Sequence, residues 1–208
     1  MVLPLNIKNI LERIHKSEDE WKALYMGVWS GVYYLEDMKK NKPELWEKKL
    51  DFGLPGSKNK KHPYIPRDLH EILKTRDKWI TLTHLQVLFS LFEDMCREAS
   101  GVLFNIYPNT YKWNEMKSFL QNIGLSQVKI AELHLSKETR NCYVHNSSKI
   151  DREWLDAYFQ ARGIKKTSLN NRDIKDGLDQ DLLHQVEDWH SLIINSTKEI
   201  EQVIVSKK

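Results

Sequence analysis

Long stretches with the hydrophobic spacing of helices alternate along this chain with shorter polar stretches. From residue 21 to residue 38, apolar residues recur every three or four positions, which places them on one face of an α-helix. Ser17 and Glu20 match a capping box, which predicts that this helix begins at Ser17, after a short separate helix over residues 6–16. The apolar positions are Trp21, Leu24, Tyr25, Val28, Val32, Leu35 and Met38.

The same spacing predicts further helices, several of them with end signals. Gly124 follows an apolar-periodic segment at the position where glycine commonly ends a helix. Ser126 and Asp151 are residue types that cap helix N-termini, so we expect a helix after each of them. The predicted helices cover residues 67–105, 111–123, the segment from Ser126 to His145, a short segment after Asp151, and 178–205.

Two segments are predicted to connect these helices. Residues 41–66 contain four prolines and two glycines and are expected to form a long connection with one helical turn around Trp46. Residues 163–177 are polar and bounded by glycine, which predicts a loop. No segment shows sustained alternation of apolar and polar residues. We therefore predict an all-α, up-and-down helical bundle that forms a single domain over residues 1–208.

Composition and charge limit the function classes. The net charge of +3 excludes a strongly basic nucleic-acid coat but permits a local basic patch. Eight lysines crowd one stretch, which fits either a solvated loop or a rim that attracts phosphates. They are Lys39, Lys40, Lys42, Lys48, Lys49, Lys58, Lys60 and Lys61.

The cysteines and the hydropathy pattern predict a cytoplasmic protein without a membrane partner. Cys96 and Cys142 lie far apart, so they form no metal-ligand pair, and two cysteines cannot supply a disulfide framework for a chain of this size. Residues 1–14 lack an apolar signal region, and no stretch of about twenty apolar residues occurs.

The candidate chemistry lies in residues 138–146. On an ideal helix, Glu138, Asn141 and His145 share one face, and His134 extends that row by one turn. Arg140 points about 140° away from His145 at 100° per residue. The two side chains therefore meet only if the helix ends or bends near His145, or if a second protomer completes the site.

Arginine and histidine suit chemistry on phosphates. The planar guanidinium grips a phosphate through two donors, and histidine can take and give a proton near neutral pH. The alternative from the residues alone is structural, a buried ion pair of Arg140 with Glu138 beside a core histidine. An Arg and a His at such a spacing arise readily by chance, whereas Asn directly after the Arg makes the pattern more specific.

Arg140-Asn141-x-x-x-His145 resembles the signature of the HEPN superfamily, an Arg, a polar residue and a His after four to six intervening residues. Val144-His145-Asn146 and the following Asp151 are also similar, so the resemblance covers about residues 132–160. It implies a HEPN-type helical bundle, here with extra helices. Similar domains often carry an acidic residue that braces the Arg, which favours Glu93 over Asp94 on the second long helix.

The resemblance also implies an activity, a metal-independent endoribonuclease in which the 2′-hydroxyl of the RNA attacks the adjacent phosphate. Arg140 would stabilise the scissile phosphate, His145 would move the proton, and Asn141 would orient the phosphate or the imidazole. Members commonly form homodimers and act in antiviral defence or toxin–antitoxin pairs, so an antitoxin or defence protein is an expected partner. Other members are catalytically inactive and serve as modules that bind a nucleotide or a protein or that mediate dimerisation.

Other kinds of site have weaker support. Glu187-x-x-His190 matches half of a di-iron pattern, Asp181-x-x-His184 imitates it weakly, and no phosphate-binding glycine loop occurs, so we expect no metal and no cofactor. The apolar stripe over residues 178–203 fits core packing, with dimerisation or antitoxin docking as the alternative. Three tryptophans could stack bases if they are exposed, although large aromatics are more often core residues. They are Trp29, Trp46 and Trp113.

Overall fold

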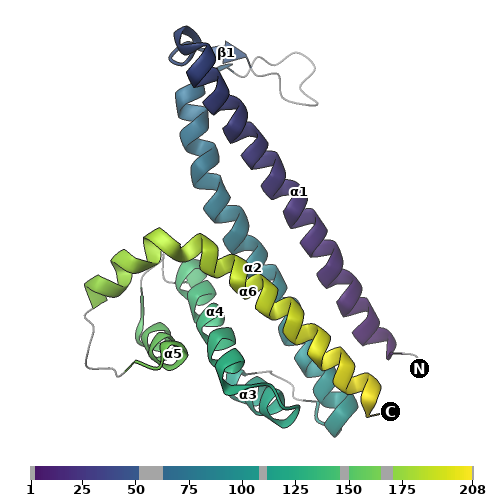
Figure 1. The fold of residues 1–208 in the computed structure, drawn as a ribbon. Helices are drawn as coiled ribbons and strands as arrows, with labels where there is room; N and C mark the ends of the chain where they lie inside the picture. The colour runs from purple at the N-terminus through teal and green to yellow at the C-terminus, as the bar shows by residue number, and fades with distance from the viewer. Residues whose placement is uncertain (1–2, 52–62, 108–111, 146–149, 165–170, 208) are drawn as a thin grey trace. The chain divides into compact units, whose positions relative to one another are not determined.

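The structure, a computed structural model, describes residues 3–51, 63–107, 112–145, 150–164 and 171–207. Within these ranges it describes only the backbone of residues 51, 63, 75, 77–79, 143–145 and 171–184. The described chain is predominantly α-helical, which confirms the all-α fold class (Figure 1). The elements are α1 (Leu5–Asn41), η1 (Pro43–Leu45), β1 (Leu50–Asp51), β2 (Pro63–Tyr64), α2 (Pro66–Phe104), α3 (Trp113–Asn122), α4 (Gln127–His145), α5 (Arg152–Arg162) and α6 (Asn171–Ser206).

Helix α1 corrects the predicted break at Ser17. One helix of 37 residues runs through this position, so the separate helix over residues 6–16 is wrong. The segment from residue 5 to residue 26 contains neither Pro nor Gly, so nothing ends the helix there. Ile7, Ile10 and Ile14 are buried at helical spacing on the stretch before Ser17, which keeps that stretch in the same helix.

The connection between α1 and α2 contains the expected helical turn. The short 3-10 helix η1 ends at Trp46, whose backbone N–H donates to the carbonyl of Pro43 at 3.1 Å. Strands β1 and β2 pair antiparallel, with Leu50 opposite Tyr64, and each contains two residues. The sequence did not predict this pair, because two residues are too few to show an alternating pattern.

Three end signals read from the sequence are confirmed. Gly124, the residue after the C-cap Ile123 of α3, has φ +90°, a left-handed conformation that favours glycine. The carboxylate of Asp151 accepts from the backbone N–H of Trp154 at 2.9 Å and so caps α5. The Ser126 hydroxyl accepts from the backbone N–H of Lys129 at 3.4 Å, at the start of α4.

Helix α6 corrects the end of the predicted loop over residues 163–177, because the helix already begins at Asn171. Residues 165–170 of that predicted loop lie outside the described residues. Between Asn171 and residue 178 the residue that most disfavours a helix is Gly177, which costs about 1 kcal/mol relative to Ala. That cost does not end α6, which has 36 residues in total. The polar composition of this segment was therefore misread as a loop.

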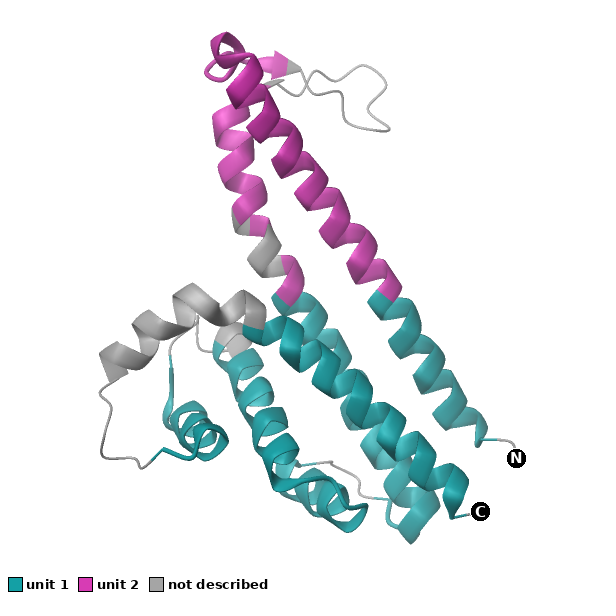
Figure 2. Ribbon diagram, in the orientation of Figure 1, with its two compact units in different colours: residues 1–18, 82–208 teal, residues 19–81 magenta. Residues whose placement is uncertain are grey.

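The chain forms two compact units (Figure 2). Unit 1 contains residues 1–18 and 82–208, and unit 2 contains residues 19–81. In unit 1, helix α4 packs against α3, α5 and α6. The core of unit 1 includes Phe89, Phe92 and Trp154, each at most 1% exposed.

Helix α6 contributes the apolar stripe that the sequence predicted for core packing. Val186, Trp189, Ile193, Ile200 and Ile204 are all buried in the core of unit 1. In unit 2, Val32, Leu35 and Met38 of α1 are buried. None of the described helices is long and apolar enough to cross a membrane.

Candidate functional site

Helix α4 carries the candidate residues, and its polar side chains form a connected group within unit 1. Glu138 is the centre of this group and is 6% exposed. Its Oε1 accepts a hydrogen bond from the Lys137 ammonium at 2.6 Å and lies 3.6 Å from Nε2 of His134. The structure therefore brings Glu138 and His134 together, as expected from their spacing of four residues.

Asn141 links Glu138 to Arg140. Its side-chain amide donates to Oε2 of Glu138 at 3.0 Å. Its side-chain carbonyl accepts from Nε and Nη2 of Arg140, at 3.3 and 3.0 Å. The bridge fixes the orientation of the guanidinium relative to α4, although Arg140 and Glu138 are not direct partners.

Glu93 on α2 and the ring of Phe89 complete the surroundings of Arg140. Oε2 of Glu93 lies 3.8 Å from Nη1 of Arg140, and the guanidinium carbon lies 5.2 Å from the centroid of the Phe89 ring. Asp94 pairs instead with Arg97, at 2.7 Å. The Arg140 side chain is 15% exposed, so its remaining donors face little solvent.

The pKa values of Glu138 and Glu93 are shifted in opposite directions. Burial raises the pKa of Glu138, but its contacts with His134, Lys137 and Asn141 outweigh burial and lower the pKa to about 2. Burial raises the pKa of Glu93, and the nearby charges of Arg140 and Lys137 only partly offset it. Glu138 thus holds a fixed negative charge, whereas Glu93 is the more easily protonated carboxyl.

Two aromatic contacts join α4 to its neighbouring helices near this polar group. The indole N–H of Trp154 on α5 donates to the Thr139 hydroxyl at 2.8 Å, and that hydroxyl donates to the carbonyl of Leu135. Trp113 on α3 stacks on the His134 ring, with centroids 4.6 Å apart and planes 7° from parallel. Trp113 therefore contacts a side chain of its own chain with one of its faces.

The structure leaves the relation of Arg140 to His145 open. Helix α4 ends at His145, but the His145 side chain lies outside the described residues, as does Asn146. The arrangement that is described can do one thing chemically. It holds the guanidinium of Arg140 in one orientation on α4, and a guanidinium in a fixed orientation is suited to binding an anion such as a phosphate.

Comparisons with known proteins found no match. No protein-family model, no curated protein and no solved structure is similar to this chain. The interpretation of the site therefore depends on its own residues and geometry.

His190, the histidine of the half di-iron pattern, is buried beside a second histidine, His84. Nδ1 of His190 on α6 lies 3.4 Å from Nδ1 of His84 on α2, and the two rings meet edge to face. Burial lowers the pKa of His84 to about 4, against the opposing influence of the Ser17 backbone and the Glu18 carboxylate. Among the described residues, no three metal-ligating side chains cluster. The side chains of Asp181 and His184 lie outside the description.

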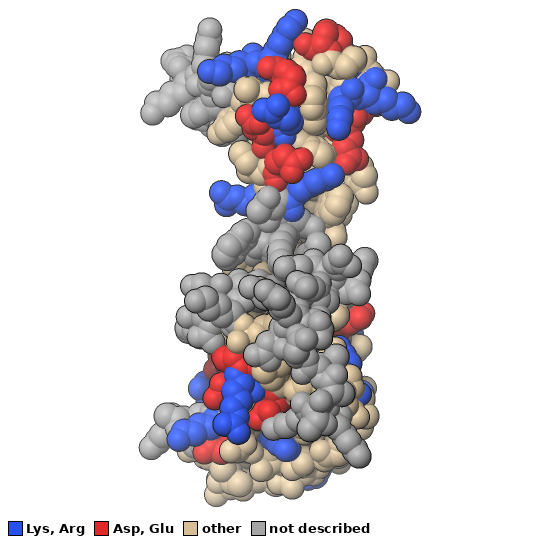
Figure 3. Space-filling view, turned by 90° about the vertical axis from the view of Figure 1, so that its left-hand side faces the viewer, with Lys and Arg blue, Asp and Glu red and all other residues tan. Residues whose placement is uncertain are grey.

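The described part of the lysine-rich stretch carries charges of both signs. Lys39 lies over the Trp46 ring at 5.3 Å, and Trp46 contacts His70 edge to face. On the face drawn in Figure 3, basic and acidic side chains are interspersed. Lys58, Lys60 and Lys61 lie outside the described residues. The described part of the stretch thus resembles a solvated surface more than a phosphate-attracting rim.

A hollow of about 360 Å³ lies apart from the candidate residues, between the end of α2 and α3. Phe104 and Phe119 line it together with Asn114 and Asn122. None of the candidate residues of α4 lines it.

Both cysteines are buried thiols of low reactivity. Burial raises the pKa of Cys142 to about 11 and holds the pKa of Cys96 well above its ordinary value. These values are unsuited to a nucleophile at neutral pH, in agreement with the absence of a cysteine from the candidate site.

Proposed function

We propose that this chain is a metal-independent endoribonuclease of HEPN type that acts in antiviral defence or in a toxin–antitoxin pair. The observation that carries the proposal is the orientation of Arg140, which Asn141 holds through two hydrogen bonds and which Glu93 approaches from another helix. Such bracing suits a guanidinium that must meet a phosphate in one orientation. Lys137, three residues before Arg140 on α4, adds a second positive charge.

The proposed reaction uses the nucleophile of the substrate itself. The 2′-hydroxyl oxygen attacks the adjacent phosphorus, its proton passes to the imidazole of His145, and the bond from phosphorus to the 5′ oxygen breaks. The imidazolium of His145 then gives that proton to the leaving 5′ oxygen and returns to its neutral form, so the products carry a 2′,3′-cyclic phosphate and a 5′-hydroxyl. Arg140 stabilises the negative charge that develops on the phosphate oxygens.

Asn141 takes a different role in this proposal from the one that the resemblance implied, which was to orient the phosphate or the imidazole. Because both ends of its side-chain amide are engaged by Glu138 and Arg140, it orients the guanidinium rather than the imidazole. Glu138 keeps Asn141 in place and stays ionised, since its pKa is about 2. A homodimer would bring His145 of the partner subunit to the Arg140 of each protomer.

One observation favours a second candidate function, a catalytically inactive HEPN-like module that binds a nucleotide or a protein partner. The Arg140 side chain is 15% exposed and already contacts Asn141, Glu93 and Phe89. These contacts are also those of a structural arginine. A protein partner such as an antitoxin would then be the ligand of this chain, without cleavage.

The deciding experiment incubates the purified chain with total tRNA and a structured messenger RNA in EDTA. Arg140→Ala and His145→Ala are compared with the wild type, and Arg13→Ala and His15→Ala, at exposed positions of α1, serve as matched controls. We expect cleavage with cyclic-phosphate ends by the wild type and the controls, and loss of about 10²–10⁴-fold in rate for His145→Ala.

The outcomes separate the two functions. Normal cleavage by either site variant contradicts the proposed active site. No cleavage by a folded wild-type chain contradicts the ribonuclease under these conditions and favours the binding module. An Arg140→Ala chain that loses several kcal/mol of unfolding free energy identifies Arg140 as a structural ion-pair residue.

A further inference from the structure

One face of α1 within unit 2 exposes apolar side chains that the rest of unit 2 does not bury. Met26 is 68% exposed and Tyr33 is 63% exposed. At 100° per residue, both lie on the opposite side of the helix from the buried Leu35. Trp29 lies between them and is half-buried, with its ring 5.7 Å from that of Tyr33. An exposed apolar stripe of this kind is typical of an interaction surface.

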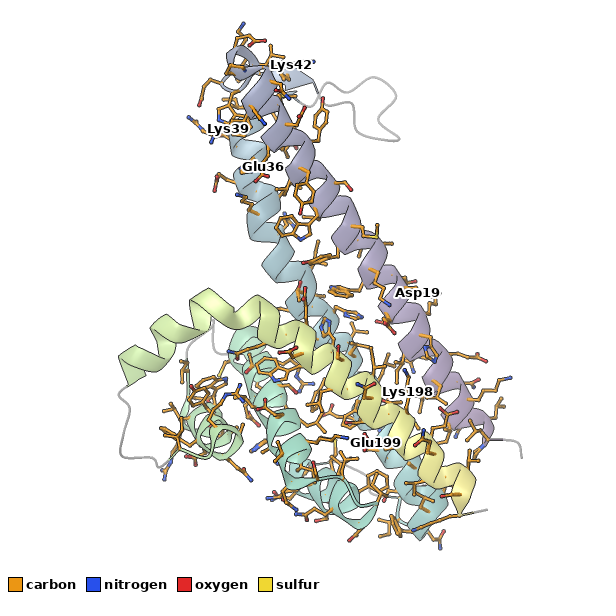
Figure 4. All side chains as sticks on the ribbon, viewed as in Figure 1. Asp19, Glu36, Lys39, Lys42, Lys198 and Glu199 are labelled. Carbon is orange, nitrogen blue, oxygen red and sulfur yellow. The ribbon has the colours of Figure 1, made fainter. Side chains whose placement is uncertain are left out.

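Charged residues flank this stripe in a regular order. Asp19 and Lys22 precede it, and Asp37 and Lys40 follow it, all four exposed. Together with Met26, Trp29 and Tyr33 they fall within a band of about 80° around the helix axis. Asp19 is labelled on α1 in Figure 4. The order of charges along the band is negative and positive before the apolar centre, then negative and positive after it.

We propose that this face of α1 binds a second copy of the chain, with the two α1 helices antiparallel about a twofold axis between residues 29 and 30. Positions equally far from that midpoint then face each other. Asp19 meets Lys40 of the partner subunit, and Lys22 meets Asp37 of the partner subunit. Met26 meets Tyr33 of the partner subunit. By symmetry each of these contacts occurs twice.

The charges select this arrangement over a parallel one. A parallel pair in register would place Lys22 beside Lys22 of the partner subunit, and Asp37 beside Asp37 of the partner subunit, so like charges would meet at every charged position. The antiparallel pair joins opposite charges at every charged position. From Asp19 to Lys40 the contact extends over about 30 Å, and steps of three and four residues suit two helices that pack side by side.

The same charges disfavour a single-stranded nucleic acid as the occupant. Aromatic side chains at regular spacing can stack bases, but such sites lie in positively charged grooves. Here two carboxylates balance two ammonium groups on the band, so the face offers phosphates no net attraction.

The proposal goes beyond the ribonuclease proposal and does not depend on it. The ribonuclease also calls for a dimer, but its readout is RNA cleavage and the residues it needs are on α4. The α1 contact is read from the assembly of the chain, so either proposal can fail while the other holds.

Charge reversal tests the contact on the full-length chain. Sedimentation velocity over a concentration series gives the dimer dissociation constant of the wild type, Lys22→Glu, Asp37→Lys and the double variant. Each single reversal turns two attractive contacts into two repulsive ones, and we expect the dissociation constant to rise on the order of tenfold. The double variant restores both opposite-charge pairs, with the signs exchanged, and should return close to the wild type.

Two further variants control the experiment. Lys198→Glu makes the same charge change at an exposed position of α6, labelled in Figure 4, and should leave the dissociation constant unchanged. Tyr33→Glu places two carboxylates at the apolar centre and should abolish the dimer. Circular dichroism checks that each variant keeps its helix content.

Rescue of dimerisation in the double variant, together with its loss in Tyr33→Glu, supports the antiparallel contact. The proposal is overturned if the wild type is monomeric at every concentration, or if none of the α1 variants changes the dimer dissociation constant. It is also overturned if the double variant has a dissociation constant as high as those of the single variants. Binding of a short single-stranded RNA that Tyr33→Glu removes, in a chain that stays monomeric, would assign the face to nucleic acid instead.

Discussion

The side-chain carbonyl of Asn141 accepts two hydrogen bonds from the guanidinium of Arg140, its neighbour in the sequence. Adjacent residues on a regular helix point about 100° apart, so such a contact requires the long Arg140 side chain to turn back along the helix surface. The contact orients Arg140 by local structure, and Glu93 then adds a contact from α2.

Replacement of Asn141 by Ala should therefore disturb Arg140 without unfolding the chain. The change removes the link between Glu138 and Arg140 and should lower the free energy of unfolding by about 1–3 kcal/mol, as expected for buried polar groups that lose a partner. Urea denaturation measures this, with Asn195→Ala, at an exposed position of α6, as the control. Equal stability of the two variants would show that the bridge contributes nothing.

The ionisation of Glu138 should make stability depend on pH in the acid range. Its pKa in the folded chain is about 2, lowered from an ordinary value of 4.5, so the stabilisation is complete above about pH 4.5 and is lost as the pH falls toward 2. The contribution is about 2–3 kcal/mol. Chemical denaturation of the wild type and Glu138→Gln at several pH values measures it, and the two curves should converge at low pH. Curves that stay parallel from pH 6 to pH 2 would contradict this role of Glu138.

Protonation of His84 should also lower the stability of the chain as the pH falls, in a pH range above that of Glu138. The folded pKa of about 4 lies below the ordinary value of 6.5, so the stabilisation is present above about pH 6.5 and is lost as the pH falls toward 4. The groups that face His84 are the backbone of Ser17, the Glu18 carboxylate and the His190 ring. Replacement of His84 by Gln should flatten this part of the pH profile, which amounts to about 2–3 kcal/mol, whereas His15→Gln at an exposed position should not.

The hydrogen bond from Trp154 to Thr139 should be detectable by a pair of matched substitutions. In Thr139→Val the indole N–H keeps its burial but loses its acceptor, which should cost about 1–3 kcal/mol of unfolding free energy. Thr139→Ser keeps the hydroxyl and should cost less, because only a methyl group is removed. Thermal unfolding compares the two variants, and a serine variant as unstable as the valine one would assign the effect to packing instead.

The sequence predicted those parts of the fold that depend on local signals. Gly124 and Asp151 each act within a few residues of their position, and both end or begin helices as expected. The helix start predicted at Ser17 was wrong. The residue types of a capping box can also occur inside a helix, where residues three apart are neighbours. The loop predicted for residues 171–177 was also wrong, because a polar helical segment without an apolar stripe has the same sequence pattern as a loop.

For the candidate site, the sequence predicted only the contacts between residues of α4. The spacing of Glu138 from His134 and Asn141 placed these side chains together, as they are in the structure. The approach of Glu93 to Arg140 and the pairing of His84 with His190 join residues far apart in the sequence. Such contacts follow from how helices pack, which no local pattern contains. The stacking of Trp113 on His134 was missed for the same reason.

The burial of both native cysteines has a practical consequence for site-directed spectroscopy. Cys96 and Cys142 are at most 5% exposed, and their thiols stay protonated at neutral pH. A maleimide or a spin label should therefore react selectively with a cysteine introduced on the surface, without prior removal of the native thiols. Ser30→Cys on the exposed side of α1 is such a site. A pair of spin labels at this position would report the separation of two copies of the helix directly, as a dipolar coupling that is strong near the twofold axis and absent in a monomer.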